Sequence, residues 1–242
     1  MKQKIMNEFF DAHVHIGQWK QKYFTAKNVF STLIDSGKIG CNFMSTTSCK
    51  PLHFENHKEI IDLYKKVKEE ILNAIKTTLS INSNKHVFYA NPYYWVVPLF
   101  HKNGITFEQV FDEVPEYKGL KIHPKAHNWN PEIKERENLL TKVFEFAQKK
   151  KLPIIFHTGS SESDDPILFE KWFKNYPTVK VTLAHCKNLK SIINLFDKYP
   201  QLNGDISFIP KENFDYLISN GYCDRLIYGS DFPINKTLYK GD

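Results

Sequence analysis

Cysteine is scarce in this sequence, and its spacing favours neither a disulfide framework nor a thiolate metal site. The 242 residues contain four cysteines, and no two of them form a Cys-x-x-Cys pair. The N-terminus carries Lys2 and Lys4 without a long apolar stretch after them, so no secretory signal is recognisable. We therefore expect reduced thiols in a cytoplasmic protein.

Long hydrophobic runs and concentrated charge are missing as well. No apolar stretch approaches the length of a membrane-spanning helix, so a membrane partner is not expected. The net charge is +6, but the lysines are dispersed over predicted helix surfaces, for example at 65–68 and 149–151. Dispersed charge is typical of a solvated surface, which makes nucleic acid an unfavoured partner.

What the sequence does contain is a regular alternation of short apolar strands and amphipathic helices. The predicted strands are 9–15, 39–46, 86–97, 119–123, 153–157, 179–185, 202–208 and 225–230. The predicted helices are 25–36, 55–78, 106–113, 131–150, 166–173, 189–199 and 213–220. About eight strand–helix units predict an α/β fold, a (β/α)8 TIM-type barrel forming a single domain over residues 1–242. Only residues 232–242 follow the last strand, so we expect the barrel to be incomplete at its C-terminal helix.

Polar residues recur where these strands end. His13 and His15 are two positions apart in the first strand, so their side chains project from the same face and form half of a metal site. Taken alone, the pair is equally compatible with two ordinary, partly buried histidines. However, later strands end in further polar residues, and in a barrel all these ends share one rim. These residues are Lys121, His123, His157, His185 and Asp231. Together they predict a metal site on that rim.

The same segments resemble the amidohydrolase superfamily. The resemblance rests on Asp-Ala-His-Val-His at 11–15, His157, His185 and Gly-Ser-Asp-Phe-Pro at 229–233. Gly-Leu-Lys-Ile-His-Pro at 119–124 is most similar to the amidohydrolase-2 branch. That branch includes hydrolases as well as decarboxylases of the aminocarboxymuconate-semialdehyde and resorcylate type. The resemblance extends from about residue 10 to residue 233.

The resemblance implies a role for each rim residue. His13, His15 and His157 would bind a divalent metal, with zinc favoured over manganese or iron, and Asp231 would be a further ligand or a close neighbour. Asp231 would also accept the proton of the attacking water. His185 would either bind a second metal or hydrogen-bond the water or the substrate oxyanion.

The fourth strand leaves two readings open. Lys121 is either carboxylated, bridging two metal ions, or a cation that binds a substrate carboxylate. We favour the second reading, and therefore one ion. His123 has either a substrate-binding role or a purely structural hydrogen bond before Pro124.

The favoured function is a metal-dependent hydrolase acting on an amide, ester or lactone bond of a small molecule. Three alternatives stay open: a decarboxylase of the same branch, a TatD-like nuclease, and a non-catalytic binding barrel. A homo-oligomer is also compatible with the sequence, and the substrate is not identified by it.

Two further groups of residues are less informative. The remaining histidines His53, His57, His101 and His127 are interpreted as solvated, and Trp19, Tyr93, Trp95 and Trp129 as pocket walls or core.

Overall fold

The computed structural model describes residues 9–49, 56–82, 87–159 and 161–238 of the chain. In these ranges strands and helices alternate, as the sequence predicts. The strands are β1 (Phe9–Trp19), β2 (Lys22–Phe24), β3 (Lys38–Ser45), β4 (Tyr89–Trp95), β5 (Gly119–Ile122), β6 (Ile154–His157), β7 (Val181–Ala184), β8 (Leu202–Asp205) and β9 (Leu226–Ile227). The helices are α1 (Ala26–Asp35), α2 (His57–Ile81), α3 (Pro98–Lys102), α4 (Phe107–Glu113), α5 (Pro124–His127), α6 (Lys134–Lys150), α7 (Glu170–Asn175), α8 (Leu189–Lys198), α9 (Lys211–Ser219) and α10 (Ile234–Leu238).

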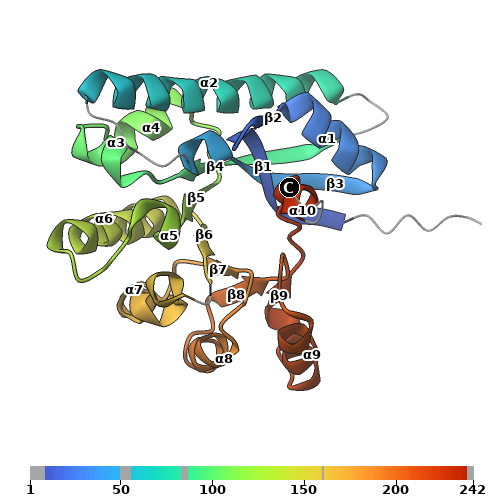
Figure 1. Cartoon of the computed structure of the whole chain (residues 1–242), viewed down its shortest axis with the longest axis vertical. Helices are drawn as coiled ribbons and strands as arrows, with labels where there is room; N and C mark the ends of the chain where they lie inside the picture. The colour runs from blue at the N-terminus through green and yellow to red at the C-terminus, as the bar shows by residue number, and fades with distance from the viewer. Residues whose placement is uncertain (1–8, 50–55, 83–86, 160, 239–242) are drawn as a thin grey trace, which may run out of the picture.

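All nine of these strands belong to one curled sheet. Its order is β2-β1-β3-β4-β5-β6-β7-β8-β9, and every neighbouring pair is parallel except the β1–β2 hairpin. Helix α2 lies along one side of the curl, and α6, α7, α8 and α9 lie around the rest of its outside (Figure 1). This arrangement follows from crossover connections, because a parallel strand pair needs a segment that returns over the sheet.

The chain after β9 turns back and runs beside β1. The amide of Asp231 donates to the carbonyl of His13 at 2.8 Å, and the amide of His15 donates to the carbonyl of Phe232 at 2.7 Å. Val14 and Phe232 also form an isolated parallel bridge. These contacts tie the segment after β9 to β1 and place Asp231 next to the two histidines of β1.

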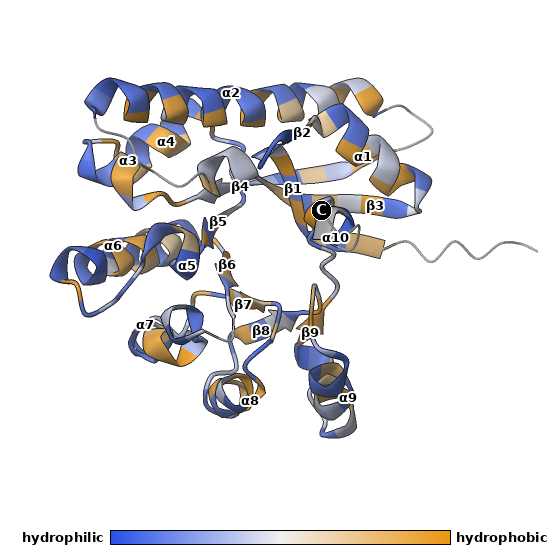
Figure 2. Ribbon diagram, viewed as in Figure 1, coloured by the Kyte–Doolittle hydropathy of each residue, from blue (hydrophilic) through white to orange (hydrophobic). Residues whose placement is uncertain are grey.

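Helix α2 shows why the helices pack where they do. The side chain of Asn56 accepts a hydrogen bond from the amide of Glu59 at 3.0 Å and so caps the helix. Ile60, Val67 and Ile71 recur at helical spacing and are buried against the sheet. Figure 2 shows the resulting alternation of orange and blue residues along α2.

Several boundaries differ from the sequence prediction. Helix α6 begins at Lys134 rather than at residue 131, because Ile133 is still extended and serves as the N-cap. Strand β9 is only two residues long, since the backbone from Gly229 to Asp231 leaves the sheet to reach β1. After β9 the described chain carries only the five-residue α10. No helix in the described ranges has the length and apolar character needed to cross a membrane.

Candidate metal centre

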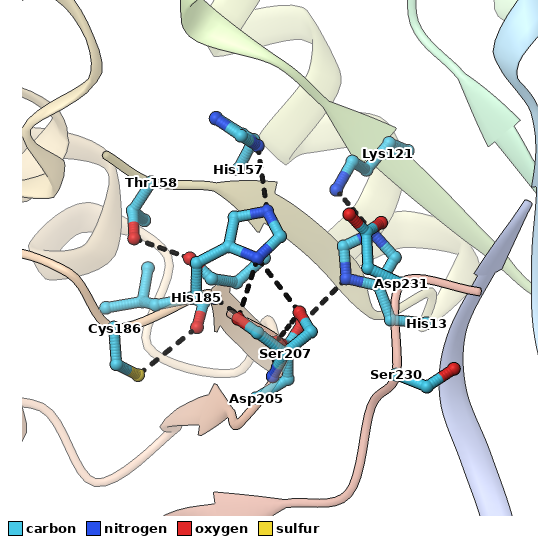
Figure 3. A network of polar contacts seen from close by, with 12 residues as sticks. His13, Lys121, His157, Thr158, His185, Cys186, Asp205, Ser207, Ser230 and Asp231 are labelled. Carbon is cyan, nitrogen blue, oxygen red and sulfur yellow. Dashed lines mark hydrogen bonds and ion pairs between the residues drawn. The ribbon is translucent and has the colours of Figure 1, made fainter. Parts of the chain in front are cut away.

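Polar side chains from six strands meet at the carboxyl edge of the curled sheet, where parallel strands of such folds present their functional residues. Figure 3 shows most of them pointing toward one another. The backbone is strained at two of these positions, because His185 and Asp231 have φ angles of 75° and 56°. The converging residues are His13 and His15 of β1, Lys121 of β5, His157 of β6, His185 after β7, Asp205 of β8 and Asp231 after β9.

His13 lies at the centre of the cluster and is almost fully buried. Its Nδ1 atom is 2.8 Å from Oδ2 of Asp205, and its Nε2 atom is 3.1 Å from Nζ of Lys121. Since a carboxylate can only accept and an ammonium can only donate, Nδ1 carries the proton and Nε2 presents a lone pair.

His15 and Asp231 bring two further ligand atoms to the same place. Nε2 of His15 is 2.6 Å from Oδ1 of Asp231, which is itself 3.3 Å from Nε2 of His13. The lone pair of His13 and a carboxylate oxygen therefore face each other at short range, an arrangement that a cation between them stabilises. All three ligand atoms lie within 4.8 Å of one another.

The two carboxylates of the cluster are ionised, and the ring of His13 is neutral. Burial opposes ionisation of Asp231, yet His13 and His15 hold its pKa below the usual range. Burial likewise opposes ionisation of Asp205, and His13 lowers the pKa of Asp205 overall. The pKa of His13 is lowered by burial and by Lys121. Ionised carboxylates and neutral imidazoles are the protonation states that metal coordination requires.

A second group of contacts joins His185 to its neighbours. Nδ1 of His185 is 3.0 Å from the carbonyl oxygen of Ser207 and 2.9 Å from its Oγ. On the other side of the ring, Nε2 is 3.0 Å from Nδ1 of His157. Burial lowers the pKa of His185 to about 4, so the ring is neutral. His13, His185 and Asp205 form another set of three ligand atoms within 4.8 Å of one another.

The cluster forms the floor of a cavity of about 180 Å³. Trp19 and Trp95 line its walls, and Lys187 adds a second cation beside Lys121. His123 is also in the lining, where its ring stacks on His157 with the ring centroids 3.6 Å apart. An outer recess of about 760 Å³ shares part of this lining and opens the cavity toward the surface. The dimensions suit a small organic molecule.

The structure thus brings together His13, His15, Lys121, His185 and Asp231. His157 is in contact with His185, but its nitrogens belong to neither of the two sets of ligand atoms found among the described residues. Its role as a metal ligand stays a prediction.

Asp205 is the residue that sequence reasoning missed. It falls within the predicted strand 202–208, whereas β8 ends at Asp205 itself. A polar residue at a strand end was the signal used elsewhere, and it would have found Asp205 had the boundary been correct.

Two expectations about the other histidines and aromatic residues were wrong in part. His127 is buried against Trp95 rather than solvated, and His101 is half-buried against Phe107, with the ring centroids 4.2 Å apart. His57 is exposed as expected, and His53 lies outside the described residues. Trp19 and Trp95 line the cavity, while Tyr93 and Trp129 belong to the core.

The fold and the cluster together define an α/β protein with a candidate metal centre at the carboxyl ends of its parallel strands. A family model described as amidohydrolase matches residues 102–239, which is more than half of the chain. The chain therefore belongs to this amidohydrolase family, and within the superfamily to the amidohydrolase-2 branch. No curated protein sequence matches it.

Solved structures with the same fold include three from this branch. An amidohydrolase II structure has a TM-score of 0.66 at 14% identity and covers 93% of this chain and 87% of its own. A probable 2-pyrone-4,6-dicarboxylic acid hydrolase from Acinetobacter baumannii, with citric acid bound, has a TM-score of 0.57 at 13% identity, covering 96% and 87%. A 5-carboxyvanillate decarboxylase from Novosphingobium aromaticivorans, with bound manganese, has a TM-score of 0.55 at 12% identity, covering 84% and 70%. At identities this low, the structural similarity shows a shared fold and nothing more.

Proposed function

We propose that this protein is a metal-dependent hydrolase that uses water to cleave an amide, ester or lactone bond of a small molecule. The observation that carries the proposal is the convergence of His13 Nε2, His15 Nε2 and Asp231 Oδ1 on the floor of a cavity. Two imidazoles and a carboxylate leave coordination positions open, which is the pattern of a catalytic rather than a structural metal site.

The residues present fit a divalent ion. His13 Nε2 offers a lone pair to the cavity, and Asp231 is an ionised carboxylate at 3.3 Å from it. Nδ1 of His15 is buried and has no hydrogen-bond partner among the described residues. The ring proton of His15 can therefore move from Nε2 to Nδ1 when Nε2 binds a cation. A nitrogen and oxygen donor set favours zinc, with manganese as the alternative, and the single compact cluster favours one ion.

A divalent ion in this position would supply Lewis acidity, polarising a carbonyl group and lowering the pKa of water toward about 7. The chain's own residues supply the rest. Asp231 keeps a second oxygen, Oδ2, that is not the one bonded to His15; Oδ2 accepts the proton of the attacking water and returns it to the leaving group. His185 and His157, both neutral, hydrogen-bond the water or the oxyanion or complete the coordination.

Lys121 and His123 would bind the substrate. Nδ1 of His123 accepts a hydrogen bond from the amide of Ala126 at 3.2 Å, so the neutral ring carries its proton on Nε2 and can donate to a substrate oxygen. Lys121 offers an ammonium group to a substrate carboxylate.

Lys121 also favours a second candidate function, decarboxylation of a carboxylated substrate. Its ammonium group lies beside the ligand cluster in a wall that also contains Lys187, and among the described residues of that lining Asp231 is the only carboxylate. Such a cavity could orient an acid group over the ion. Carbon dioxide release without consumption of water would distinguish this reaction from hydrolysis.

Three related inferences complete the proposal. The backbone bonds between β1 and residues 231–232 support a complete (β/α)8 barrel of the TIM type. The size of the cavity supports a small-molecule substrate rather than nucleic acid. Cytoplasmic location and homo-oligomerisation stay predictions from the sequence.

The test is metal analysis combined with turnover. The purified protein is stripped of metal, reloaded with zinc or manganese, and analysed for bound ion and for activity on carboxylated lactones, esters and amides. We expect one ion per chain, lost in His15→Ala and Asp231→Asn. The control is Glu113→Gln, which alters a partly buried carboxylate that bonds Tyr64 and Lys68, belongs to neither set of ligand atoms and should keep the ion. Absence of a stoichiometric ion from the wild type, or full turnover in Asp231→Asn, would overturn the proposal.

A further inference from the structure

Asp205 is a buried carboxylate that holds the two halves of the cluster together. Its Oδ2 accepts from Nδ1 of His13 at 2.8 Å. Its Oδ1 accepts from the amide of His185 at 3.1 Å, from the amide of Ser207 at 3.0 Å and from the Ser207 hydroxyl. The side chain is almost fully buried, and its pKa is low despite burial because His13 lies beside it. Four donors on one ionised carboxylate leave it no freedom to rotate.

The contact with His13 decides which nitrogen of that ring carries hydrogen. An ionised carboxylate is an acceptor only, so the proton is on Nδ1 and the lone pair is on Nε2. The position of Lys121 agrees, since its Nζ donates to Nε2 at 3.1 Å. Asp205 therefore presents the nitrogen of His13 that faces His15 and Asp231 as a ligand atom.

Asp205 also holds Ser207, whose two oxygens accept from His185. The single hydroxyl hydrogen of Ser207 is directed at Asp205, so Oγ can only accept from His185, as does the carbonyl oxygen of Ser207. Nδ1 of His185 must then be the protonated nitrogen. Its Nε2 accepts from Nδ1 of His157 at 3.0 Å. Figure 3 shows this continuous path from Asp205 through Ser207 and His185 to His157.

We propose that Asp205 is a positioning residue that fixes the protonated nitrogen of His13 and holds Ser207 in place against His185. It does not touch the cavity and is not among its lining residues. Its effect on metal affinity rests on the proposed function, whereas its effect on the hydrogen positions of the imidazoles does not.

Asp205→Asn is the decisive substitution. The two backbone amides of His185 and Ser207 would retain the amide oxygen of the new side chain, so its NH2 group would face His13. That group can only donate, which forces the hydrogen of His13 from Nδ1 to Nε2. The ligand lone pair would then point away from the cluster. Ser207→Ala is the matched control, because it leaves the bond between His13 and Asp205 in place.

Long-range proton–nitrogen NMR on the 15N-labelled, metal-free protein reads these positions, and zinc titration then measures affinity. We expect His13 to carry hydrogen on Nδ1 in the wild type and in Ser207→Ala, and on Nε2 in Asp205→Asn. We expect zinc affinity to fall about 10- to 100-fold in Asp205→Asn alone. Hydrogen on Nε2 of wild-type His13 would overturn the proposal without any variant, as would a folded Asp205→Asn protein with unchanged His13. A wild type with the expected hydrogen positions but no zinc binding would overturn the proposed function instead.

Discussion

Nζ of Lys121 lies 3.1 Å from Nε2 of His13, so a side-chain ammonium already caps the lone pair that a metal ion would use. Burial lowers the pKa of Lys121 to about 8, with Asp231 and Asp205 opposing that shift, so the group is still mostly charged at neutral pH. A divalent ion bound to His13 would repel this ammonium. Lys121 lines the cavity, so its displaced ammonium group can bind a substrate carboxylate there.

This relationship makes Lys121→Met informative. If Lys121 is a substrate-binding cation, the variant should keep one ion per chain, and its kcat/KM on a carboxylated substrate should fall about 100-fold, which is about 3 kcal/mol. Lys187→Met is the comparison, since it removes the other cation of the cavity and leaves His13 untouched. Metal analysis and steady-state kinetics give the answer. A wild type with two ions, one of which disappears in Lys121→Met, would instead identify a carboxylated bridging lysine.

Gly17 in β1 is a second position where substitution should be costly. Its φ angle is 88°, and a Cβ atom there would lie 2.7 Å from Oε2 of Glu70 and from Oγ of Ser45. Gly37 provides a matched control, because its φ angle is 82° but no atom lies within 4 Å of the added Cβ. We expect Gly37→Ala to lower the free energy of unfolding by about 1 kcal/mol from backbone strain, and Gly17→Ala by about 3 kcal/mol. Urea unfolding measures both, and equal losses would show that the crowding around Gly17 does not matter.

The extent to which this architecture could be predicted depends on the range of the interactions involved. Strand and helix order follow from local hydrophobic periodicity, which is why His157 and His185 were placed at strand ends correctly. The first strand was predicted too short, because β1 continues past His13 and His15 to Trp19. The location of Asp231 beside His13 depends on contacts between residues more than two hundred positions apart. The strand-end pattern predicted that both residues lie on one rim, and the resemblance to a known family added the expectation that they share a metal ion.

Boundaries limited the rest of the prediction. Asp205 was missed because strand periodicity alone does not show that β8 ends there. His127 was taken as solvated because it lies in a short segment with no apolar pattern, yet it is buried and its ring contacts Trp95. The burial of an isolated polar residue is set by tertiary packing, which leaves no local trace in the sequence.

Arg225 contributes to stability in a way that Lys could not replace. In its guanidinium group, Nη1 donates to the carbonyl oxygen of Phe196 at 3.2 Å, Nη2 to that of Tyr199 at 2.7 Å, and Nε to that of Leu202 at 2.8 Å. These groups lie at the end of α8 and the start of β8, where backbone carbonyls need partners. We expect Arg225→Lys to lower the free energy of unfolding by about 1 to 2 kcal/mol, because one ammonium cannot reach all three carbonyls. Urea unfolding of Arg225→Lys beside wild type tests this, and an unchanged midpoint would contradict it.

His101 should make the stability of the protein depend on pH. Burial lowers its pKa to about 4, and Tyr94 lies with its hydroxyl 3.3 Å from Nε2 of the ring. In the unfolded chain the pKa of a histidine is about 6.5, so below that pH the unfolded state binds a proton that the folded state does not. The stability contributed by neutral His101 is therefore complete above about pH 6.5 and is lost as the pH falls toward 4.

Comparison of wild type with His101→Phe isolates this effect, since the other buried histidines are common to both proteins. From pH 7 to pH 5 we expect the wild type to lose about 2 kcal/mol more of its free energy of unfolding than His101→Phe does. Phe107→Leu is the control: it loosens the packing on the same ring and should lower stability equally at both pH values. Parallel losses in wild type and His101→Phe would show that His101 is protonated in the folded protein at pH 5.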